Sequence, residues 1–228
     1  MTDAAMVTRD RVRRVVERDL RPVRPLWSPL RRVAVLAPIA LAVAALAASK
    51  YGLRHDVGQL GAVVTWGLSA LEWTLGFVIL GLALRQAVPG YGVSLRILTT
   101  GCVATAVLIV AATFMTYAIH PEFVPAAKAW RVWYLCLIGP LQIGAPLMIA
   151  AAALAARATP TRPTAVGALC GLAAGIVCDS GWRLTCSFSA PAHVFGAHVL
   201  AVLLLAATGA VLVHFSVGRR IDVPIQMH

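Results

Sequence analysis

Charged residues are scarce in this chain, since only 13% of its 228 residues are Asp, Glu, Lys or Arg, whereas a soluble domain carries roughly 25%. Acidic residues are especially few, with nine Asp and Glu against 20 Lys and Arg. Together with 60% hydrophobic residues and a mean hydropathy of +0.81, this scarcity excludes a soluble globular domain and a disordered chain. The ten-residue alternation of a transmembrane barrel is also missing, so we expect membrane-spanning helices.

Several motifs of catalysis and nucleotide binding are absent as well. The sequence contains no P-loop, no C-x-x-C pair, no H-E-x-x-H and no nucleophile elbow. We therefore expect neither enzyme activity nor a bound cofactor. A membrane thiol oxidoreductase is the least favoured alternative, because the C-x-x-C pair typical of thiol redox enzymes is missing.

Six long apolar runs make up most of the chain. A bilayer core of about 30 Å needs roughly 20 apolar residues in a helix, and polar or Pro/Gly-containing joints separate the runs. We predict an all-α, polytopic membrane protein with a basic segment at 1–32, a six-helix membrane domain at 33–217 and a tail at 218–228. The predicted spans are Val33–Leu53, Leu60–Leu84, Ile97–Ile119, Trp130–Ala156, Thr164–Leu184 and Val194–Phe215.

Basic residues are distributed unevenly about these spans. If the N-terminus is cytoplasmic, that side carries 15 Lys and Arg, nine of them before residue 33, and the other side carries five. The positive-inside rule then places both termini in the cytoplasm, since six spans return the chain to its starting side. This accounts for the basic charge without direct binding of nucleic acid, which we do not expect. The five on the other side are Lys50, Arg54, Lys128, Arg131 and Arg183.

The first 32 residues contain an amphipathic pattern. Five apolar residues recur at helical spacing and form one stripe, arginines occupy the other faces, and two prolines end the pattern. Such a helix can lie on anionic lipid or insert its apolar face into a groove of a partner. A surface helix that only helps to set topology is the alternative. The stripe is Val12, Val15, Val16, Leu20 and Val23, and the prolines are Pro22 and Pro25.

Three different short motifs lie before the first span or at joints between spans. The stretch DLRPVRPL (Asp19–Leu26) precedes the first span, AVPG (Ala87–Gly90) follows the second, and PTRP (Pro160–Pro163) precedes the glycine-containing fifth span. In this order and spacing, and over most of the chain, they resemble the NrsF-like family of bacterial six-helix membrane anti-sigma factors.

The resemblance implies a negative regulator that holds an extracytoplasmic-function sigma factor at the inner membrane and releases it on a chemical signal. Two family cysteines implicated in sensing oxidants or heavy metals correspond to Cys136 and Cys186. Many relatives follow the second cysteine with acidic residues, whereas SFSAP (Ser187–Pro191) follows it here, so the identity of the signal stays open. We assign sigma binding to the N-terminal segment, through Val12, Val15, Val16, Asp19, Leu20, Pro22, Val23, Pro25 and Leu26.

The predicted topology sorts the five cysteines. Cys136, Cys178 and Cys186 fall near the outer side, where an oxidising compartment permits disulfide chemistry. Cys136 and Cys186 could form a disulfide if their Cα atoms lie within about 7 Å, or could bind a soft metal ion as thiolates. The remaining alternative, which we expect for Cys102 and Cys170, is packing as small hydrophobic side chains.

Two histidines open the sixth span. His193 lies close to Cys186 in sequence and could join the two thiols in a metal site or lower the pKa of the thiol, although a solvated histidine is the simpler interpretation. His193 and His198 are five residues apart, which is about 140° around an α-helix. We therefore do not expect them to share a face.

Glu72 is a carboxylate within the second predicted span. An ionisable residue inside the bilayer is expensive and raises a functional hypothesis, here a small-solute or ion transporter or channel. Because no partnering Lys, Arg or second acid is apparent for it, we favour a role in helix packing over a proton relay. Asp179 and Arg183, four residues apart, are predicted to pair at the outer end of the fifth helix.

Overall fold

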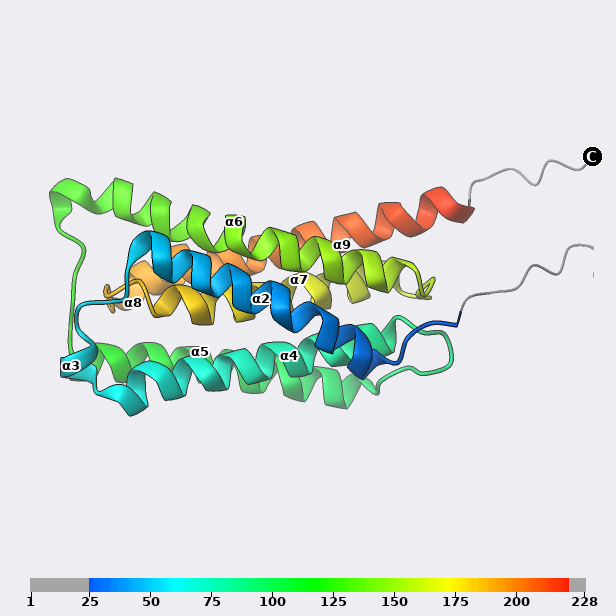
Figure 1. Ribbon diagram of the computed structural model, residues 1–228, viewed down its shortest axis with the longest axis horizontal. Helices are drawn as coiled ribbons and strands as arrows, with labels where there is room; N and C mark the ends of the chain where they lie inside the picture. Colours follow the sequence, from blue (N-terminus) through cyan, green and yellow to red (C-terminus); the bar gives the residue numbers. More distant parts are fainter. Residues whose placement is uncertain (1–24, 222–228) are drawn as a thin grey trace, which may run out of the picture.

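The computed structural model describes residues 25–221, with side chains to Gly218, and every regular element in that part of the chain is helical (Figure 1). Six helical segments are long and apolar enough to cross a membrane, which confirms the predicted all-α fold with six spans. They run over Pro29–Tyr51, Val63–Gln86, Leu95–Ile119, Ala126–Ala156, Pro163–Arg183 and Pro191–Gly218.

Three of these segments are single α-helices, and the other three include a short turn of another helical type. The single helices are α2 (Pro29–Tyr51), α5 (Leu95–Ile119) and α7 (Pro163–Arg183). A π-helical turn, η1 (Val63–Gly67), leads into α4 (Leu68–Gln86), and a 3₁₀ turn, η2 (Ala126–Lys128), leads into α6 (Ala129–Ala156). The sixth segment combines α8 (Pro191–His193), the π-helical turn η3 (Val194–Val199) and α9 (Leu200–Ile221), and the short helix α3 (Val57–Leu60) follows α2.

The structure extends the first predicted span at its start. The Ser28 side chain accepts a hydrogen bond from the Arg31 backbone N–H at 3.3 Å, and Pro29 occupies the first turn, as is common at helix N-termini. Helix α2 therefore begins four residues before the predicted Val33, because Arg31 and Arg32 are helical although they are not apolar. Arg32 is buried and donates a hydrogen bond from Nη2 to the Leu84 carbonyl at 2.9 Å, which ties α2 to α4.

Helix α7 is the central helix of the bundle. In an apolar 18-residue stretch of α7, 67% of the residues are buried, against 17–44% in the corresponding stretches of the other five spans. A Cβ atom at Gly171 would overlap the backbone of Leu205 and Ala206 on α9. Small residues at such crossings let two membrane helices approach closely, and this approach fixes α9 against α7.

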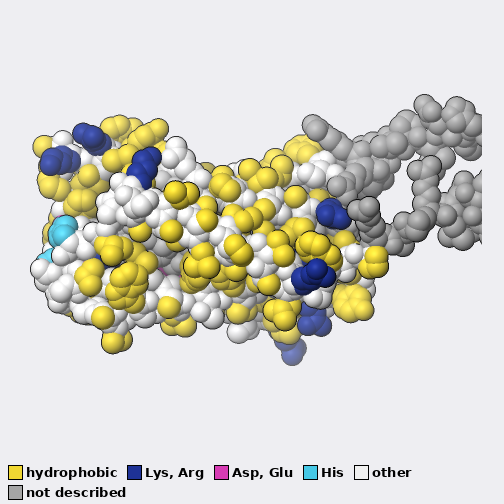
Figure 2. Space-filling view, in the orientation of Figure 1, with side chains coloured by type: hydrophobic (Ala, Val, Ile, Leu, Met, Phe, Trp, Pro, Cys, Tyr) yellow, Lys and Arg dark blue, Asp and Glu magenta, His cyan; other side chains and the backbone are white. Residues whose placement is uncertain are grey.

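The outer surface of the bundle is apolar over its length. Large hydrophobic side chains point outward from several helices, with Leu30, Val63 and Leu95 exposed by 79%, 85% and 72%. On the face seen in Figure 2, Lys and Arg side chains gather at the two ends and apolar side chains cover the middle. An extended exposed apolar surface of this kind fits contact with lipid.

The two ends of the bundle differ in what they carry. The arginine end contains the turns at 87–94 and 157–162 and both limits of the described chain (Figure 1). The cysteine end contains the loops at 52–56, 120–125 and 184–190. Arginines at the first of these ends lie in or next to its two turns and at the start of α2, namely Arg31, Arg32, Arg85, Arg96, Arg157 and Arg162.

Backbone hydrogen bonds join the three loops of the cysteine end. The Arg54 N–H donates to the Leu184 carbonyl at 2.8 Å, and the Ser189 N–H donates to the Glu122 carbonyl at 3.1 Å. The Glu122 N–H in turn donates to the Ser189 hydroxyl at 2.9 Å. Because loop 184–190 is bonded to both of the others, its position is fixed from two sides.

A buried ion pair stabilises the same loops. The Arg54 guanidinium donates two hydrogen bonds to the Asp56 carboxylate, at 2.6 and 2.7 Å, and one to the Ser187 carbonyl at 3.3 Å. Burial opposes ionisation of Asp56, but the hydrogen bonds and charge of Arg54 outweigh it, so the pKa of Asp56 lies below its ordinary value. Asp56 is therefore a carboxylate at neutral pH, and both of its oxygens accept hydrogen bonds from Arg54.

Candidate functional site

Two thiols from distant parts of the sequence meet at the cysteine end. Cys136 comes from the second turn of α6 and Cys186 from loop 184–190, and their sulfur atoms lie 3.6 Å apart. Cys136 is buried and Cys186 is partly buried, and both pack beside Trp182. The hydrogen bond between the thiols and, after it, burial raise the pKa of the Cys186 thiol well above its ordinary value. Cys186 thus keeps its proton at neutral pH while the two thiols are unmodified.

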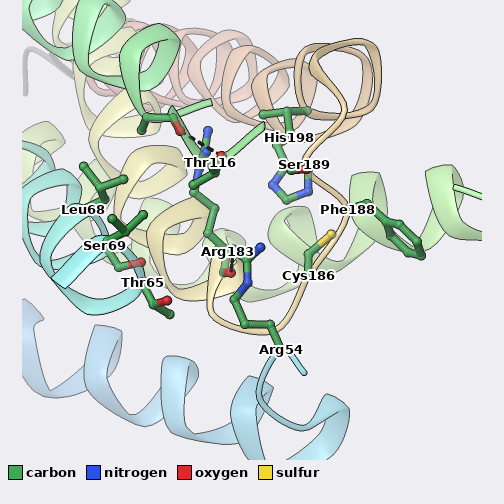
Figure 3. Close-up of a pocket in the computed structure, with 13 residues that line it drawn as sticks. Arg54, Thr65, Leu68, Ser69, Thr116, Arg183, Cys186, Phe188, Ser189 and His198 are labelled. Carbon is green, nitrogen blue, oxygen red and sulfur yellow. Dashed lines mark hydrogen bonds between the residues drawn. The ribbon is translucent and has the colours of Figure 1, made fainter. Parts of the chain in front are cut away.

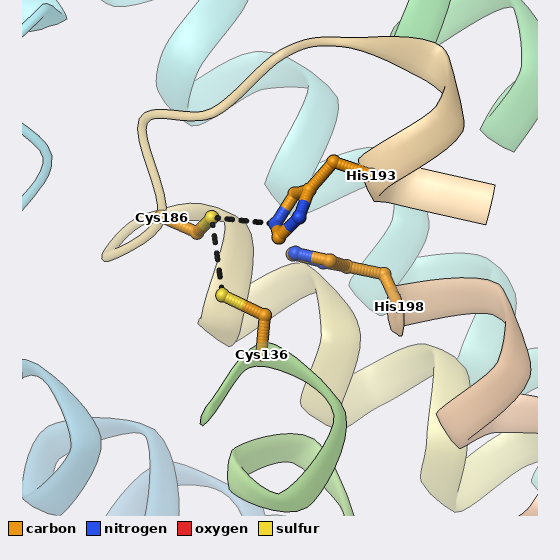
Figure 4. Close-up of side chains that lie close together, drawn as sticks. All are labelled: Cys136, Cys186, His193 and His198. Atoms are coloured by element: carbon orange, nitrogen blue, oxygen red, sulfur yellow. Dashed lines mark hydrogen bonds between the residues drawn. The ribbon is translucent and has the colours of Figure 1, made fainter. Parts of the chain in front are cut away.

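Two buried imidazoles complete this group. Nε2 of His193 lies 3.6 Å from the Cys186 sulfur, and the rings of His193 and His198 are 5.5 Å apart. One ligand atom from each of the two cysteines and two histidines lies within 4.8 Å of every other one. Figure 4 shows the four side chains converging from three separate elements. We call this group, Cys136, Cys186, His193 and His198, the thiol–imidazole cluster.

The prediction that His193 and His198 do not share a face is wrong. They come together because the helix between them is not an α-helix: η3 is π-helical over Val194–Val199. Hydrogen bonds of a π-helix run from residue i to i+5, so residues five apart lie above one another. The spacing of the apolar residues does not indicate this local change in helix type. Two histidines in an apolar span are costly, however, and this cost is a signal in the sequence for a functional site.

Behind the cluster, charged side chains continue into the bundle. Nδ1 of His198 lies 2.8 Å from Asp179 Oδ1, and the other carboxylate oxygen of Asp179 accepts a hydrogen bond from Arg183 Nε at 3.0 Å. The same Nε lies 3.4 Å from the Glu72 carboxylate on α4. The predicted pair of Asp179 and Arg183 is confirmed, and it forms the middle of a longer chain.

The expectation that Glu72 has no charged partner is wrong, since its partner is Arg183. The two residues are far apart in sequence and meet only because α4 packs against α7. Their pairing therefore depends on tertiary packing and cannot be inferred from either helix alone. Glu72 is 1% exposed, and neither of its oxygens accepts a hydrogen bond in the described part of the chain. The ion pair with Arg183 is therefore what holds this carboxylate.

A small cavity adjoins the charged chain and the cluster. It has a volume of about 30 Å³, and Arg54, Arg183, Cys186 and His198 are among its lining residues (Figure 3). A water molecule needs about 10–15 Å³ of such space, so the cavity accommodates one or two waters. It is too small for an organic solute.

Comparison with known proteins identifies the family. A family model described as negative regulator of sigma F, NrsF, matches residues 17–217. The chain belongs to the NrsF family. Membership implies a negative regulator of a sigma factor, with a sigma factor as its partner. No curated protein and no solved structure matches the chain.

The other three cysteines of this NrsF-family chain lie away from the cluster. Cys170 and Cys178 are buried on α7 within the main apolar core, and Cys102 is partly exposed on α5. Cys178, whose role the sequence left open, thus packs with apolar side chains. Only Cys136 and Cys186 of the five combine mutual proximity with a place at the cysteine end.

Most of the predicted sigma-binding segment falls outside the described residues. Val12, Val15, Val16, Asp19, Leu20, Pro22 and Val23 belong to that part. Pro25 and Leu26 are described and lie at the arginine end, with Leu26 exposed by 42%. Its described residues, Pro25 and Leu26, therefore lead into α2 at the end opposite to the thiol–imidazole cluster.

Proposed function

We propose that this NrsF-family chain is a membrane-bound anti-sigma factor that holds an extracytoplasmic-function sigma factor at the bacterial inner membrane. Both termini and the arginine end face the cytoplasm, and the cysteine end faces outward. Chemical modification of Cys136 and Cys186, by an oxidant or a heavy-metal ion, weakens the grip on the sigma factor and releases it.

The single observation that carries this proposal is the meeting of two thiols at the end of the bundle opposite to both limits of the described chain. Their sulfur atoms are 3.6 Å apart, so one reagent can engage both. The excess of 15 over five basic residues supports a cytoplasmic arginine end. A signal received outside is then separated by the length of the bundle from Pro25 and Leu26, the described residues of the predicted sigma-binding segment.

Two reactions of the thiol pair are chemically complete. A two-electron oxidant such as diamide or a peroxide takes two electrons and two protons from the thiols, and a sulfur–sulfur bond forms. A thiophilic metal ion instead displaces the two protons and binds both thiolates. Disulfide formation draws loop 184–190 and α6 together, whereas a bound ion cross-links them near their present separation. Cys186 is the thiol that a reagent reaches first because it is the more exposed.

The charged chain supplies a route for transmission along the bundle. Modification of the thiols alters the neighbours of His198, which is bound to Asp179, and Asp179 is bound to Arg183. Arg183 contacts α4 through Glu72 and α5 through Thr113, at 3.4 Å each. A coupling of about 1–3 kcal/mol changes partner affinity roughly 5- to 150-fold, which is sufficient for release.

The basic charge of residues 1–32 bears on how the sigma factor is bound. Nine of these residues are Arg, so the segment does not imitate the acidic surface of DNA. It is suited to bind an apolar or acidic surface of the sigma factor, and its predicted apolar face is the stripe of Val12, Val15, Val16, Leu20 and Val23. A transporter or channel based on Glu72 gains no comparable support, since Glu72 is paired with Arg183 beside a cavity of only about 30 Å³.

Co-purification from membranes tests the proposal. The full chain is expected to retain the sigma factor, and deletion of residues 1–26 to abolish its retention. Diamide or cadmium is expected to release it from the parent and not from Cys136→Ser or Cys186→Ser. Cys170→Ser is the matched control, because Cys170 is a buried thiol on α7 outside the cluster.

Two outcomes contradict the proposal. Retention of the sigma factor by the deleted chain would move the interface to the turns at 87–94 and 157–162. Labelling of Cys186 by a membrane-impermeant maleimide only after the cells are opened would place the cysteine end on the cytoplasmic side.

A further inference from the structure

We propose that Cys136, Cys186, His193 and His198 form a closed tetrahedral site for one divalent cation with a filled d shell, Zn²⁺ or Cd²⁺. Asp179 is the positioning residue that orients His198. The inference deepens the proposed function by naming the ligand set and the class of ion. It rests on that function only for the consequence of binding, because occupancy itself follows from the geometry of the cluster.

The separations within the cluster match the edges of a tetrahedral site. With zinc–sulfur bonds of about 2.3 Å and zinc–nitrogen bonds of about 2.0–2.1 Å, two sulfurs lie about 3.8 Å apart and a sulfur and a nitrogen about 3.6 Å apart. The sulfurs of Cys136 and Cys186 are 3.6 Å apart, and so are the Cys186 sulfur and His193 Nε2. Two edges are thus already in place, and the fourth ligand lies within 4.8 Å of the other three.

His198 provides an independent sign of a ligand. The residue is 1% exposed, its Nδ1 is held by Asp179, and its Nε2 has no hydrogen-bond partner among the described residues. A buried polar atom without a partner costs free energy, and in Figure 4 this ring faces the Cys136 thiol and His193. A carboxylate on one ring nitrogen and a metal on the other is the usual arrangement of metal-binding histidines.

The backbone conformation brings His193 and His198 together, so that both can bind the same ion. The π-helical turn Val194–Val199 brings His198 beneath His193, and π-helical turns are frequent at functional sites. The four ligands come from α6, loop 184–190 and the α8–η3 segment. An ion bound by them would cross-link three elements of the cysteine end, which thiols alone would not do.

Charge and ligand softness select the class of ion. A divalent cation displaces one proton from each thiol, so the ion, two thiolates and two neutral imidazoles sum to zero, as a site near a bilayer requires. Two sulfur and two nitrogen ligands in a tetrahedron favour Zn²⁺ and Cd²⁺, whereas Mg²⁺ and Ca²⁺ need oxygen. The nearby group of Asp56, His120 and Glu122 is not a second such site, because Arg54 occupies both oxygens of Asp56.

Cadmium binding by the purified full-length protein in detergent tests the inference. The expected result is one Cd²⁺ per chain with a sulfur-to-cadmium charge-transfer absorption, and X-ray absorption that shows two sulfur and two nitrogen neighbours. His193→Gln and His198→Gln each lower the affinity about 10- to 100-fold. Gln at 198 retains an amide that can donate to Asp179, and gel filtration verifies that each variant is folded.

Further variants separate the ligands from residues that only support the fold. Asp179→Asn is expected to lower the affinity about tenfold and to reduce the nitrogen signal while both sulfur neighbours remain, which a general loss of stability would not do. Cys178→Ser is the matched control, because Cys178 is a buried thiol on α7 outside the cluster, and it leaves the affinity unchanged.

Specific outcomes overturn the inference without touching the proposed function. Cadmium held by two sulfurs, with unchanged affinity in both histidine variants, would reduce the site to the thiol pair. No cadmium binding at all would show that the cluster is not a metal site. If diamide still releases the sigma factor in that case, the anti-sigma function stands. Four-coordinate binding without any release of the sigma factor by cadmium or diamide would contradict the function and leave the metal site in place.

Discussion

The cysteine end and the arginine end of the bundle are built from different kinds of interaction. At the cysteine end, three loops are joined by backbone hydrogen bonds and by the buried pair of Arg54 and Asp56. Beside them, the thiol–imidazole cluster is linked through Asp179 and Arg183 to Glu72. The arginine end connects its helices by short turns and carries exposed cations, among them Arg85 and Arg96.

This difference shows which end can act as a switch. Buried charged groups are stable only as a satisfied set, so removal of one member destabilises the others. Exposed charges at the other end interact weakly with their surroundings but give that end its positive field. In the proposed function, a chemical event at the cysteine end therefore changes the structure, and the arginine end faces the cytoplasm and the partner.

Loss of the Arg183 charge should destabilise the cysteine end most. Arg183→Gln leaves the carboxylates of Asp179 and Glu72 buried without their cation, which costs about 3–5 kcal/mol. Denaturant unfolding in detergent, followed by tryptophan fluorescence, measures the free energy of unfolding. The control Arg85→Gln removes an exposed arginine at the other end and should change it by no more than about 0.5 kcal/mol. Equal losses of unfolding free energy in the two variants would contradict the difference between the buried charges of the cysteine end and the exposed charges of the arginine end.

Acid should loosen the cysteine end through Asp56. Because the pKa of Asp56 is lowered in the folded protein, its ionised form stabilises the fold above the unfolded pKa of about 3.9. That stabilisation is lost as the pH falls through the folded pKa. Asp56→Asn at neutral pH should cost about 1–3 kcal/mol, seen as faster hydrogen exchange in loops 52–56 and 184–190.

The pH series distinguishes Asp56 from other acids. The exchange rates of the parent and of Asp56→Asn should converge as the pH falls below about 4, because the parent then loses the same charge. Comparison at each pH cancels the intrinsic dependence of exchange on pH. A difference that persists unchanged at the lowest pH would show that Asp56 acts through shape and not through its charge.

The six spans could be predicted from the sequence because the length of an apolar run is a local property. The pair of Asp179 and Arg183 is also local, at four residues' separation on one helix. The partner of Glu72 could not be found in this way, since Arg183 lies on another helix and only their packing joins them. The position of His198 was missed for a different reason, because a π-helical turn changes the helical period over six residues.

The cysteine pair shows where local reasoning ends. The family resemblance singled out Cys136 and Cys186, but their separation depends on how loop 184–190 folds over α6. Hydrogen bonds from Arg54 and Glu122, in two other loops, set that position. No pattern within loop 184–190 contains this information, so the geometry of the site required the structure.

The smallest effect is expected at the arginine end, at the N-terminus of α2. Ser28 caps α2 there, and its hydrogen bond from the Arg31 N–H is long, at 3.3 Å. Ser28→Ala should therefore cost about 0.5 kcal/mol, at the low end for such caps, seen as roughly twofold faster hydrogen exchange in the first turn of α2. Exchange in loop 184–190 should stay unchanged, because no hydrogen bond among the described residues joins this cap to that loop. Faster exchange in that loop would show that α2 couples the two ends, and the route of the signal would then run along α2 as well as through Arg183.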